Sequence, residues 1–84
     1  MDILFVEQSW EDYLYWQKND KTILKRIHML IKDIQRDSFD GIGKPELLKY
    51  DMAGYWSRRI DNEHRLVYKV EDETIIIVQC RYHY

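Results

Sequence analysis

Six residues of types that transfer protons or hold negative charge lie in the second half of the chain: Glu46, Lys49, Arg59, Arg65, His83 and Tyr84. Together they supply a base, an acid and several cations without a metal. Cleaving RNA from within needs these parts. A base takes the proton from the 2′-hydroxyl, cations hold the charge on the pentacoordinate phosphorus, and an acid protonates the departing 5′-oxygen. Their spacing alone leaves open that they are ordinary surface groups.

Other chemistries find less support in the sequence. The three histidines and Cys80 have no metal-ligand spacing and the carboxylates do not cluster, so we expect no metal and no cofactor. Gly41 and Gly43 lack the strand, helix and lysine of a phosphate-binding loop. Cys80 follows an apolar run, which predicts a small buried side chain and not a nucleophile. His64 alternates with apolar residues, which predicts a packed histidine.

Length and composition predict one globular domain over residues 1–84, with 45% hydrophobic and 14% aromatic residues. The net charge of −2 gives no general case for nucleic-acid binding, although arginines on strands can form a local basic patch. A single cysteine excludes an internal disulfide and fits the reducing cytoplasm. We expect no signal peptide, because acids stand at Asp2 and Glu7, and no membrane span, because no run approaches about 20 apolar residues.

The first half of the chain predicts a short strand and two helices. Residues 1–6 read as a strand. Ser9 followed by Asp12 resembles a capping box, which predicts a helix over 10–18. Asp20 can cap a second helix over 21–36, whose apolar residues recur at helical spacing. We expect these helices to be antiparallel and to cover one face of a sheet.

The second half predicts a loop over 37–45 and an antiparallel meander with strands at 46–50, 55–60, 63–70 and from 74 onward. The last strand is rich in β-branched residues, so we expect it at the centre of the sheet, covered on both faces and rigidly presenting the residues up to Tyr84. Alternation places Arg65 and one of Arg58 and Arg59 on the face away from the helices. An alternative for the last residues is that Tyr82 and Tyr84 only plug the core and His83 is solvated.

Five stretches closely resemble the YoeB toxins of the RelE-like superfamily of ribosome-dependent mRNA interferases. They are SWEDYLYW at 9–16, GKPE at 43–46, GYWSRRI at 54–60, EHRLVY at 63–68 and CRYHY at 80–84. The resemblance runs the length of the chain. It implies an α+β, RelE-like, microbial RNase-like fold with two N-terminal helices on a mainly antiparallel twisted sheet.

The resemblance also implies roles for the candidate residues. Glu46 matches the general base, Arg65 the group that stabilises the phosphorane, His83 the general acid and Tyr84 a residue that orients the substrate. Lys49 and Arg59 match cations near the scissile phosphate. Leu47 stands where this family leads us to expect proline.

The implied function is that of a toxin of a type II toxin–antitoxin module, an endoribonuclease that cleaves mRNA in the ribosomal A site. The implied partners are a YefM-type antitoxin, the ribosome and mRNA, with a homodimer left open, and the implied location is the cytoplasm. Two alternatives remain. In the first alternative the chain is a module that binds RNA or the ribosome without cleaving. In the second it is a catalytically inactive protein that only binds an antitoxin.

Overall fold

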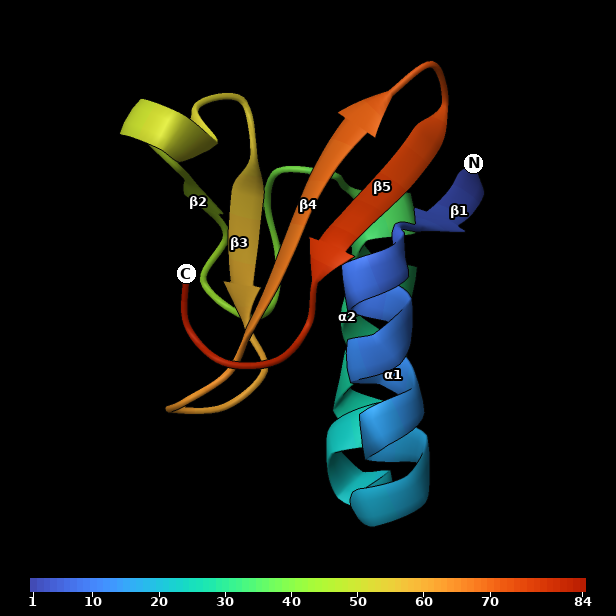
Figure 1. Cartoon of the computed structure of the whole chain (residues 1–84). Coiled ribbons are helices and arrows are strands. Elements are labelled where there is room, and N and C mark those ends of the chain that lie inside the picture. Colours follow the sequence, from blue (N-terminus) through green and yellow to red (C-terminus); the bar gives the residue numbers. More distant parts are fainter.

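Two helices pack against one face of a five-stranded sheet (Figure 1). The computed structural model describes all 84 residues, and its elements in chain order are β1 (Asp2–Phe5), α1 (Glu7–Asn19), α2 (Lys21–Arg36), β2 (Glu46–Leu47), the 3₁₀ turn η1 (Tyr50–Met52), β3 (Trp56–Arg59), β4 (Arg65–Glu71) and β5 (Thr74–Gln79). The strand order is β1-β5-β4-β3-β2. β1 runs parallel to β5 and every other neighbouring pair is antiparallel. The expected α+β class with a mainly antiparallel sheet is confirmed.

Helix α2 forms as its sequence predicts. The side chain of Asp20 accepts hydrogen bonds from the amides of Thr22 and Ile23, so it caps the first turn. The apolar stripe of the helix is buried against the sheet, in a core made of Trp16, Leu24, Ile27, Leu30, Ile31, Ile34, Ile60, Leu66, Tyr68, Ile75, Ile77 and Cys80. Neither helix is long and apolar enough to span a membrane.

Helix α1 begins earlier than predicted, at Glu7, and Ser9 lies inside its first turn instead of at the cap position. The Ser9 side chain is fully buried and donates to the carbonyl oxygens of Val6 and Ile77, so it ties the helix to β5 instead of capping it. Asp12, the expected partner in a capping box, is also buried and accepts a hydrogen bond from the amide of Cys80. The capping-box reading of these two residues is wrong.

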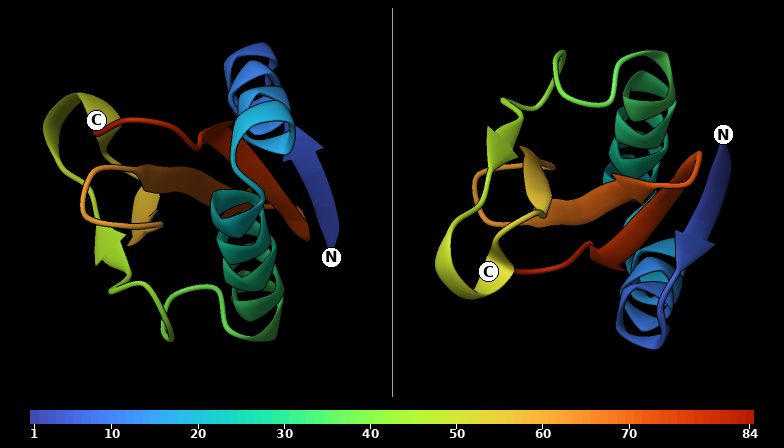
Figure 2. Two further views of the ribbon diagram at one scale, coloured as in Figure 1. Left: turned by 90° about the horizontal axis from the view of Figure 1, so that it is seen from below. Right: turned by 90° about the horizontal axis from the view of Figure 1, so that it is seen from above.

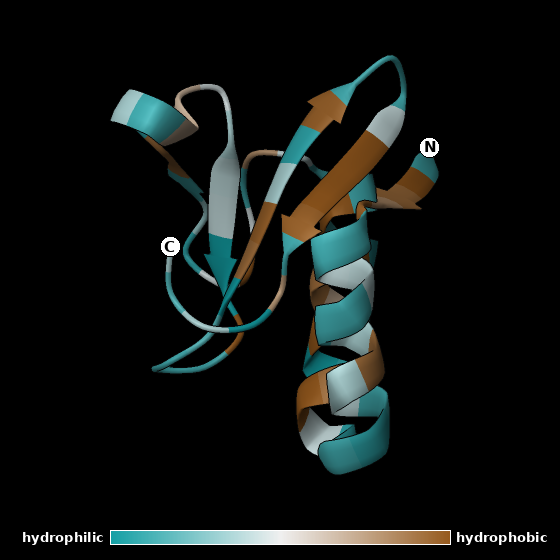
Figure 3. Ribbon diagram, viewed as in Figure 1, coloured by the Kyte–Doolittle hydropathy of each residue, from teal (hydrophilic) through white to brown (hydrophobic).

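Three strand predictions need correction. The strand expected over 46–50 ends at Leu47, because the chain turns into η1 with Tyr50 at φ +58°. The turn between β3 and β4 is wider than two residues, since the amide of Ile60 bonds to the carbonyl of His64 and β4 starts at Arg65. β5 lies inside the sheet but beside its central strand β4, and its outward residues Ile76 and Val78 are only partly buried. The hydrophobic run of β5 ends before a mostly hydrophilic tail (Figure 3).

A fully buried arginine joins β3 to α2 and to the loop that follows this helix. The Arg58 guanidinium pairs with the Asp33 carboxylate and donates to the carbonyl oxygens of Asp37, Asp40 and Ile42. Burying this charge is tolerable because nearly all of its donors are satisfied. The amide of Ile42 also bonds to Asp33, and this bond together with the Arg58 charge lowers the pKa of Asp33 to about 2.

This arrangement predicts how stability changes in acid. A carboxyl group whose pKa is lowered on folding stabilises the protein above its unfolded pKa of about 4, and that contribution is lost as the pH falls through about 2. Asp33→Asn should therefore lower the urea midpoint at pH 6, with the gap to the parent closing between pH 4 and 2. Arg36→Ala, which removes the exposed partner of Asp33, should lower the midpoint less. A gap for Asp33→Asn that does not change with pH would contradict the assignment.

Candidate active site

The register of the sheet brings three of the candidate side chains to one face. Arg59 is paired with Arg65 across β3 and β4, and Glu46 is paired with Ser57 across β2 and β3. Paired residues, and residues two apart on one strand, share a face. Glu46, Arg59 and Arg65 therefore lie on the face opposite to that of Arg58, which points into the core beneath α2. Arg59, and not Arg58, is the arginine that shares this face with Arg65.

The prediction that residues 80–84, here called the tail, continue β5 is wrong. After Gln79 the chain leaves the sheet, turns back across the ends of β4 and β3, and finishes beside η1 (Figure 2). The amide of Arg65 donates to the carbonyl of Tyr82 at 3.0 Å, so the first residue of β4 holds the tail one residue before His83. His83 and Tyr84 are exposed and do not plug the core.

Helix α1 holds the start of the tail on both sides of Cys80. The Asp12 carboxylate accepts from the Cys80 amide at 3.1 Å, and the indole N–H of Trp16 donates to the Cys80 carbonyl at 2.8 Å. The Arg81 guanidinium lies 3.5 Å above the ring of Tyr15 and 4.5 Å from the ring of Tyr82, which adds cation–π contacts. The path of the tail is thus set by α1, whose hydrogen bonds to Cys80 join residues 64 and 68 positions apart.

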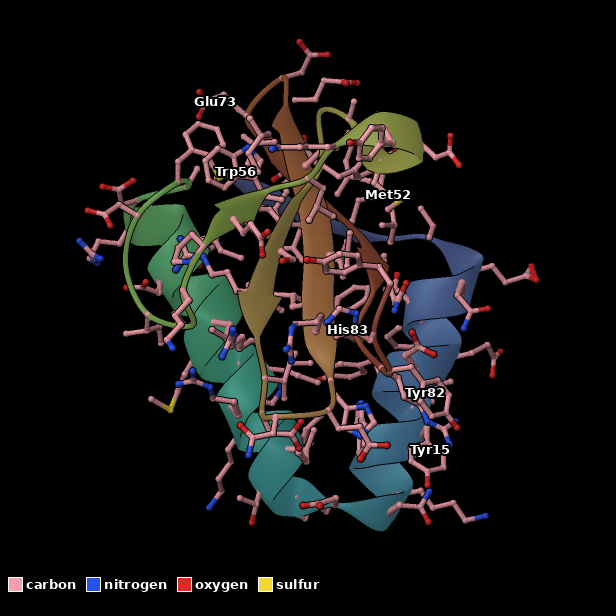
Figure 4. All side chains as sticks on the ribbon, turned by 90° about the vertical axis from the view of Figure 1, so that its left-hand side faces the viewer. Tyr15, Met52, Trp56, Glu73, Tyr82 and His83 are labelled. Carbon is pink, nitrogen blue, oxygen red and sulfur yellow. The ribbon has the colours of Figure 1, made fainter.

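His64 holds the middle of the tail. Its Nδ1 accepts a hydrogen bond from the amide of Tyr82 at 2.7 Å, and its ring packs edge-on against Trp16 with centroids 4.7 Å apart. An accepting Nδ1 carries no proton, so the ring is the neutral tautomer with its hydrogen on Nε2. The prediction that His64 is a packed histidine is confirmed, and the structure adds its contact with the tail. Figure 4 shows His83 between Tyr82, near α1, and Met52 of η1.

The end of the tail meets β2. The Tyr84 hydroxyl donates to Oε1 of Glu46 at 3.3 Å, which links residues 38 positions apart. The Nδ1 atom of His83 bonds to the backbone oxygen of Tyr84 at 3.0 Å, and Nε2 of His83 has no hydrogen-bond partner within the chain. The imidazole therefore keeps one nitrogen available to a ligand.

The cations of this face differ in how firmly they are held. Arg65 is almost fully buried, and its guanidinium donates to the carbonyl oxygens of Asp61 and His64. Arg59 and Lys49 are exposed and form no ion pair with an acid. Lys49 lies with Glu46 and Tyr84 around one hollow beside η1. Positive charge without acidic partners is suited to binding an anion such as a phosphate.

Cys80 takes no part in this chemistry. Burial, and the nearby Asp12 carboxylate, raise the pKa of its thiol to about 12, so the reactive thiolate does not form at neutral pH. No three His, Cys, Asp or Glu side chains come together in a way that could hold a metal ion. The site consequently consists of the carboxylate of Glu46, the imidazole of His83, the hydroxyl of Tyr84 and three cations, Lys49, Arg59 and Arg65.

Comparison with known proteins places the chain in a family. Residues 5–84 match the model of the YoeB-like toxin of bacterial type II toxin–antitoxin systems. The chain belongs to this YoeB family. It is 62% identical to the Toxin YoeB of Synechocystis sp. over 84 residues. The aligned region covers the whole of this chain and 98% of that protein. It is accordingly a toxin of the type II toxin–antitoxin class.

Solved YoeB structures have the same fold. The YoeB/ParE toxin from Agrobacterium tumefaciens superimposes over the full length of both chains with a TM-score of 0.98 at 48% identity. The YoeB of Staphylococcus aureus, in a heterotetrameric complex with YefM, superimposes with a TM-score of 0.93 at 53% identity, over the whole chain and 98% of that protein. The S. aureus protein is also known as a dimer. The RelE-like fold expected from the sequence is confirmed.

Sequence reasoning missed the residues that hold the tail in place. Ser9 and Asp12 are expected to form a helix cap, and Trp16 is expected only to belong to the helix over 10–18. The one available signal was the polarity of Ser9 and Asp12, three residues apart on the face that must be buried. Those buried polar groups require partners, but local sequence could not indicate that Ile77 and Cys80 supply them.

The contact between His64 and Tyr82 predicts a measurable change in the tail. His64→Leu keeps an apolar group against Trp16 but removes the acceptor, so the Tyr82 amide should exchange with solvent about 2- to 13-fold faster, the loss of a bond worth about 0.5 to 1.5 kcal/mol. His64→Gln, which retains an acceptor oxygen, should have a smaller effect. Exchange is followed by NMR with the Ile27 amide in α2 as the reference, and unchanged exchange at Tyr82 would show that the bond does not restrain the tail.

Proposed function

We propose that this YoeB-family toxin is an endoribonuclease that cleaves mRNA in the ribosomal A site, using the RNA's own 2′-hydroxyl as the nucleophile and no metal ion. The observation that carries the proposal is the meeting of the tail with β2, where the Tyr84 hydroxyl bonds to the carboxylate of Glu46. That contact gathers a base, an acid and unpaired cations around one exposed surface. Such a set matches the requirements of 2′-hydroxyl attack.

In this mechanism Glu46 takes the proton of the 2′-hydroxyl, and the oxygen attacks the adjacent phosphorus. Arg65 stabilises the additional negative charge of the phosphorane, and its two carbonyl contacts keep the guanidinium oriented before the substrate binds. Lys49 and Arg59, which have no acidic partners, hold the phosphate.

His83 completes the reaction as the general acid. Its Nδ1 is engaged with the backbone of Tyr84, so the free Nε2 is the atom that gives its proton to the departing 5′-oxygen. Tyr84 orients the substrate through its ring and its contact with Glu46. The products are a 2′,3′-cyclic phosphate on the upstream fragment and a 5′-hydroxyl on the downstream fragment.

The ribosome has a physical role in this proposal. Affinity for RNA depends on neutralising phosphates, and a protein with a net charge of −2 and a few unpaired cations binds free RNA weakly. The ribosomal A site would supply the positioning that the small toxin lacks. The toxin thereby inhibits translation, and its place of action is the cytoplasm.

The proposed protein partner is a YefM-type antitoxin, as in the S. aureus complex. A groove of about 580 Å³ between α1, α2 and the free edge of β1 supports this. Its lining includes the apolar side chains of Phe5, Trp10 and Ile31 together with His28 and Lys32. α2 carries five cations and one acid, which favours an acidic amphipathic segment. A homodimer, as known for S. aureus YoeB, is compatible with this partner.

End-group analysis tests the reaction. Programmed ribosomes incubated with the toxin should yield a downstream fragment with a 5′-hydroxyl, which polynucleotide kinase labels without prior phosphatase treatment, and an upstream fragment ending in a cyclic or 3′-phosphate. Attack by water would instead leave a 5′-phosphate downstream, and that result would overturn the mechanism. Simple chelation is not informative, because ribosomes themselves require Mg²⁺.

His83→Gln separates cleavage from binding. The variant keeps size and polarity but cannot donate a proton at neutral pH, so single-turnover cleavage on ribosomes should slow by about 10²- to 10⁴-fold. Because His83 is exposed, the melting temperature should change little. Truncation of His83 and Tyr84 should have the same two results. A non-cleaving ribosome-binding module would show no difference between variant and parent, and a fully active truncation would remove His83 from the mechanism.

A further inference from the structure

Tyr82, the residue before the proposed general acid, has an uncommon backbone conformation. Its φ of +65° lies in the left-handed region, which is costly for a bulky residue. Both of its backbone polar groups are bonded to the start of β4. The Tyr82 amide donates to Nδ1 of His64 at 2.7 Å, and the Tyr82 carbonyl accepts from the amide of Arg65 at 3.0 Å. These two bonds hold the turn from which the chain continues to His83 (Figure 4).

The two bonds differ in what they require. The bond from Arg65 joins two backbone groups, neither of which titrates. The bond to His64 requires an Nδ1 atom without a proton. Nε2 already carries the hydrogen of the neutral ring, so a second proton adds at Nδ1, where it would face the N–H of Tyr82 across the same 2.7 Å. The imidazolium form of His64 therefore cannot accept this bond.

The ring of His64 is nearly buried but has an acid beside it. Its side chain is 9% exposed, and Nε2 lies 3.6 Å from the carboxylate of the exposed Glu63. Trp16, the residue of α1 that packs on the ring, brings no charge. The titratable and charged groups near the ring come from its own turn and from the tail: Asp61, Glu63, Arg65, Arg81 and Tyr82. Glu63 thus offers a protonated ring an ion-pair partner on the side away from Tyr82.

We propose that neutral His64 is a positioning residue for the general acid His83, and that protonation of His64 releases the turn at Tyr82 and stops cleavage. The inference rests on the proposed endoribonuclease function and names how that site is regulated. His83 must carry a proton to act on the departing 5′-oxygen, whereas His64 must lack one to hold the tail. The two histidines are needed in opposite protonation states, which confines cleavage to a window of pH.

This requirement predicts the shape of the pH profile. Histidine is the side chain that changes its charge between about pH 8 and 5. As the pH falls from 8, the single-turnover rate of cleavage on programmed ribosomes should first rise while His83 gains its proton. It should then fall toward pH 5.5 as His64 gains one. An ordinary carboxylate stays ionised down to about pH 5, so loss of the general base does not explain a fall in this range.

His64→Asn is the decisive variant. The Asn side-chain oxygen branches from Cγ, as Nδ1 does in histidine, and it accepts a hydrogen bond at every pH. Its rate should approach that of the parent at pH 7.5 and should not fall toward pH 5.5. His64→Leu, which has no acceptor, should be about 2- to 13-fold slower than the parent at pH 7.5, as expected for one lost hydrogen bond. That loss should appear at saturating ribosome concentration, because the general acid acts only in the transition state.

Two further variants test the surroundings of the ring. Glu63→Gln removes the ion-pair partner of the protonated ring but keeps the acceptor at Nδ1, so the acid-side fall should move to lower pH. Asp72→Asn is the matched control, because it removes an exposed acid beyond the other end of β4 and should leave the profile of the parent unchanged. Melting temperatures at pH 7.5 and 5.5 separate unfolding from release of the tail.

NMR on the toxin alone separates this inference from the proposed reaction. The amides of His83 and Tyr84 should become mobile at pH 5.5 in the parent and stay ordered in His64→Asn. If the parent yields the 5′-hydroxyl product but shares the same acid-side fall with His64→Asn, His64 does not position the acid and the endoribonuclease stands. A parent whose tail loosens in acid but which cleaves at no pH would overturn the endoribonuclease, and with it the role of His64 in cleavage.

Discussion

The site depends on how the tail is held after it leaves the sheet. β5 ends at Gln79, and a freely solvated tail would sample many conformations at a cost of about 1 to 2 kcal/mol per residue when ordered. Three hydrogen bonds offset part of that cost before any substrate binds: from the Cys80 amide to Asp12, from the Trp16 indole to the Cys80 carbonyl, and from the Tyr82 amide to His64. The remaining residues of the tail are then close enough to β2 for the contact between Tyr84 and Glu46.

Two adjacent arginines show how strand geometry separates structure from function. Arg58 points into the core, where its guanidinium donates hydrogen bonds to Asp33 and to loop carbonyls. These bonds fix the position of α2 relative to β3. Arg59 points to the opposite face, where it pairs across the sheet with Arg65 and has no acid to neutralise it. The same side-chain chemistry therefore stabilises the fold on one face and creates a positive surface on the other.

The two edges of the sheet carry surfaces of different character. At the β1 edge, the groove beside the helices is lined mainly by apolar side chains, with Lys32 and His28 among them, which suits an amphipathic segment of a protein. At the β2 edge, the Glu46 carboxylate, the unpaired Lys49 and exposed tyrosines surround a smaller hollow beside the arginines of the sheet face. Because the edges are separated by the width of five strands, a partner at one leaves the other unoccupied unless it is long enough to reach around the molecule.

The sequence by itself determined the elements whose stability comes from local or periodic interactions. The apolar stripe of α2 and the cap at Asp20 predicted that helix, and β-branched runs with short turns predicted the antiparallel strands. The motifs around Arg59, Arg65 and His83 were enough to identify the family, because they combine uncommon residues over the whole chain.

Only the tertiary structure decided which partners the buried polar groups take. Ser9 and Asp12 have the local pattern of a cap, but burial against β5 and Cys80 gives them long-range partners with which solvent does not compete. The direction of the tail could not be predicted for the same reason. It is set by His64 and Trp16, residues distant in sequence, whereas local preference favours extending the strand. Hydrogen bonds between distant residues depend on the packed core that brings them together, and local propensity does not contain that information.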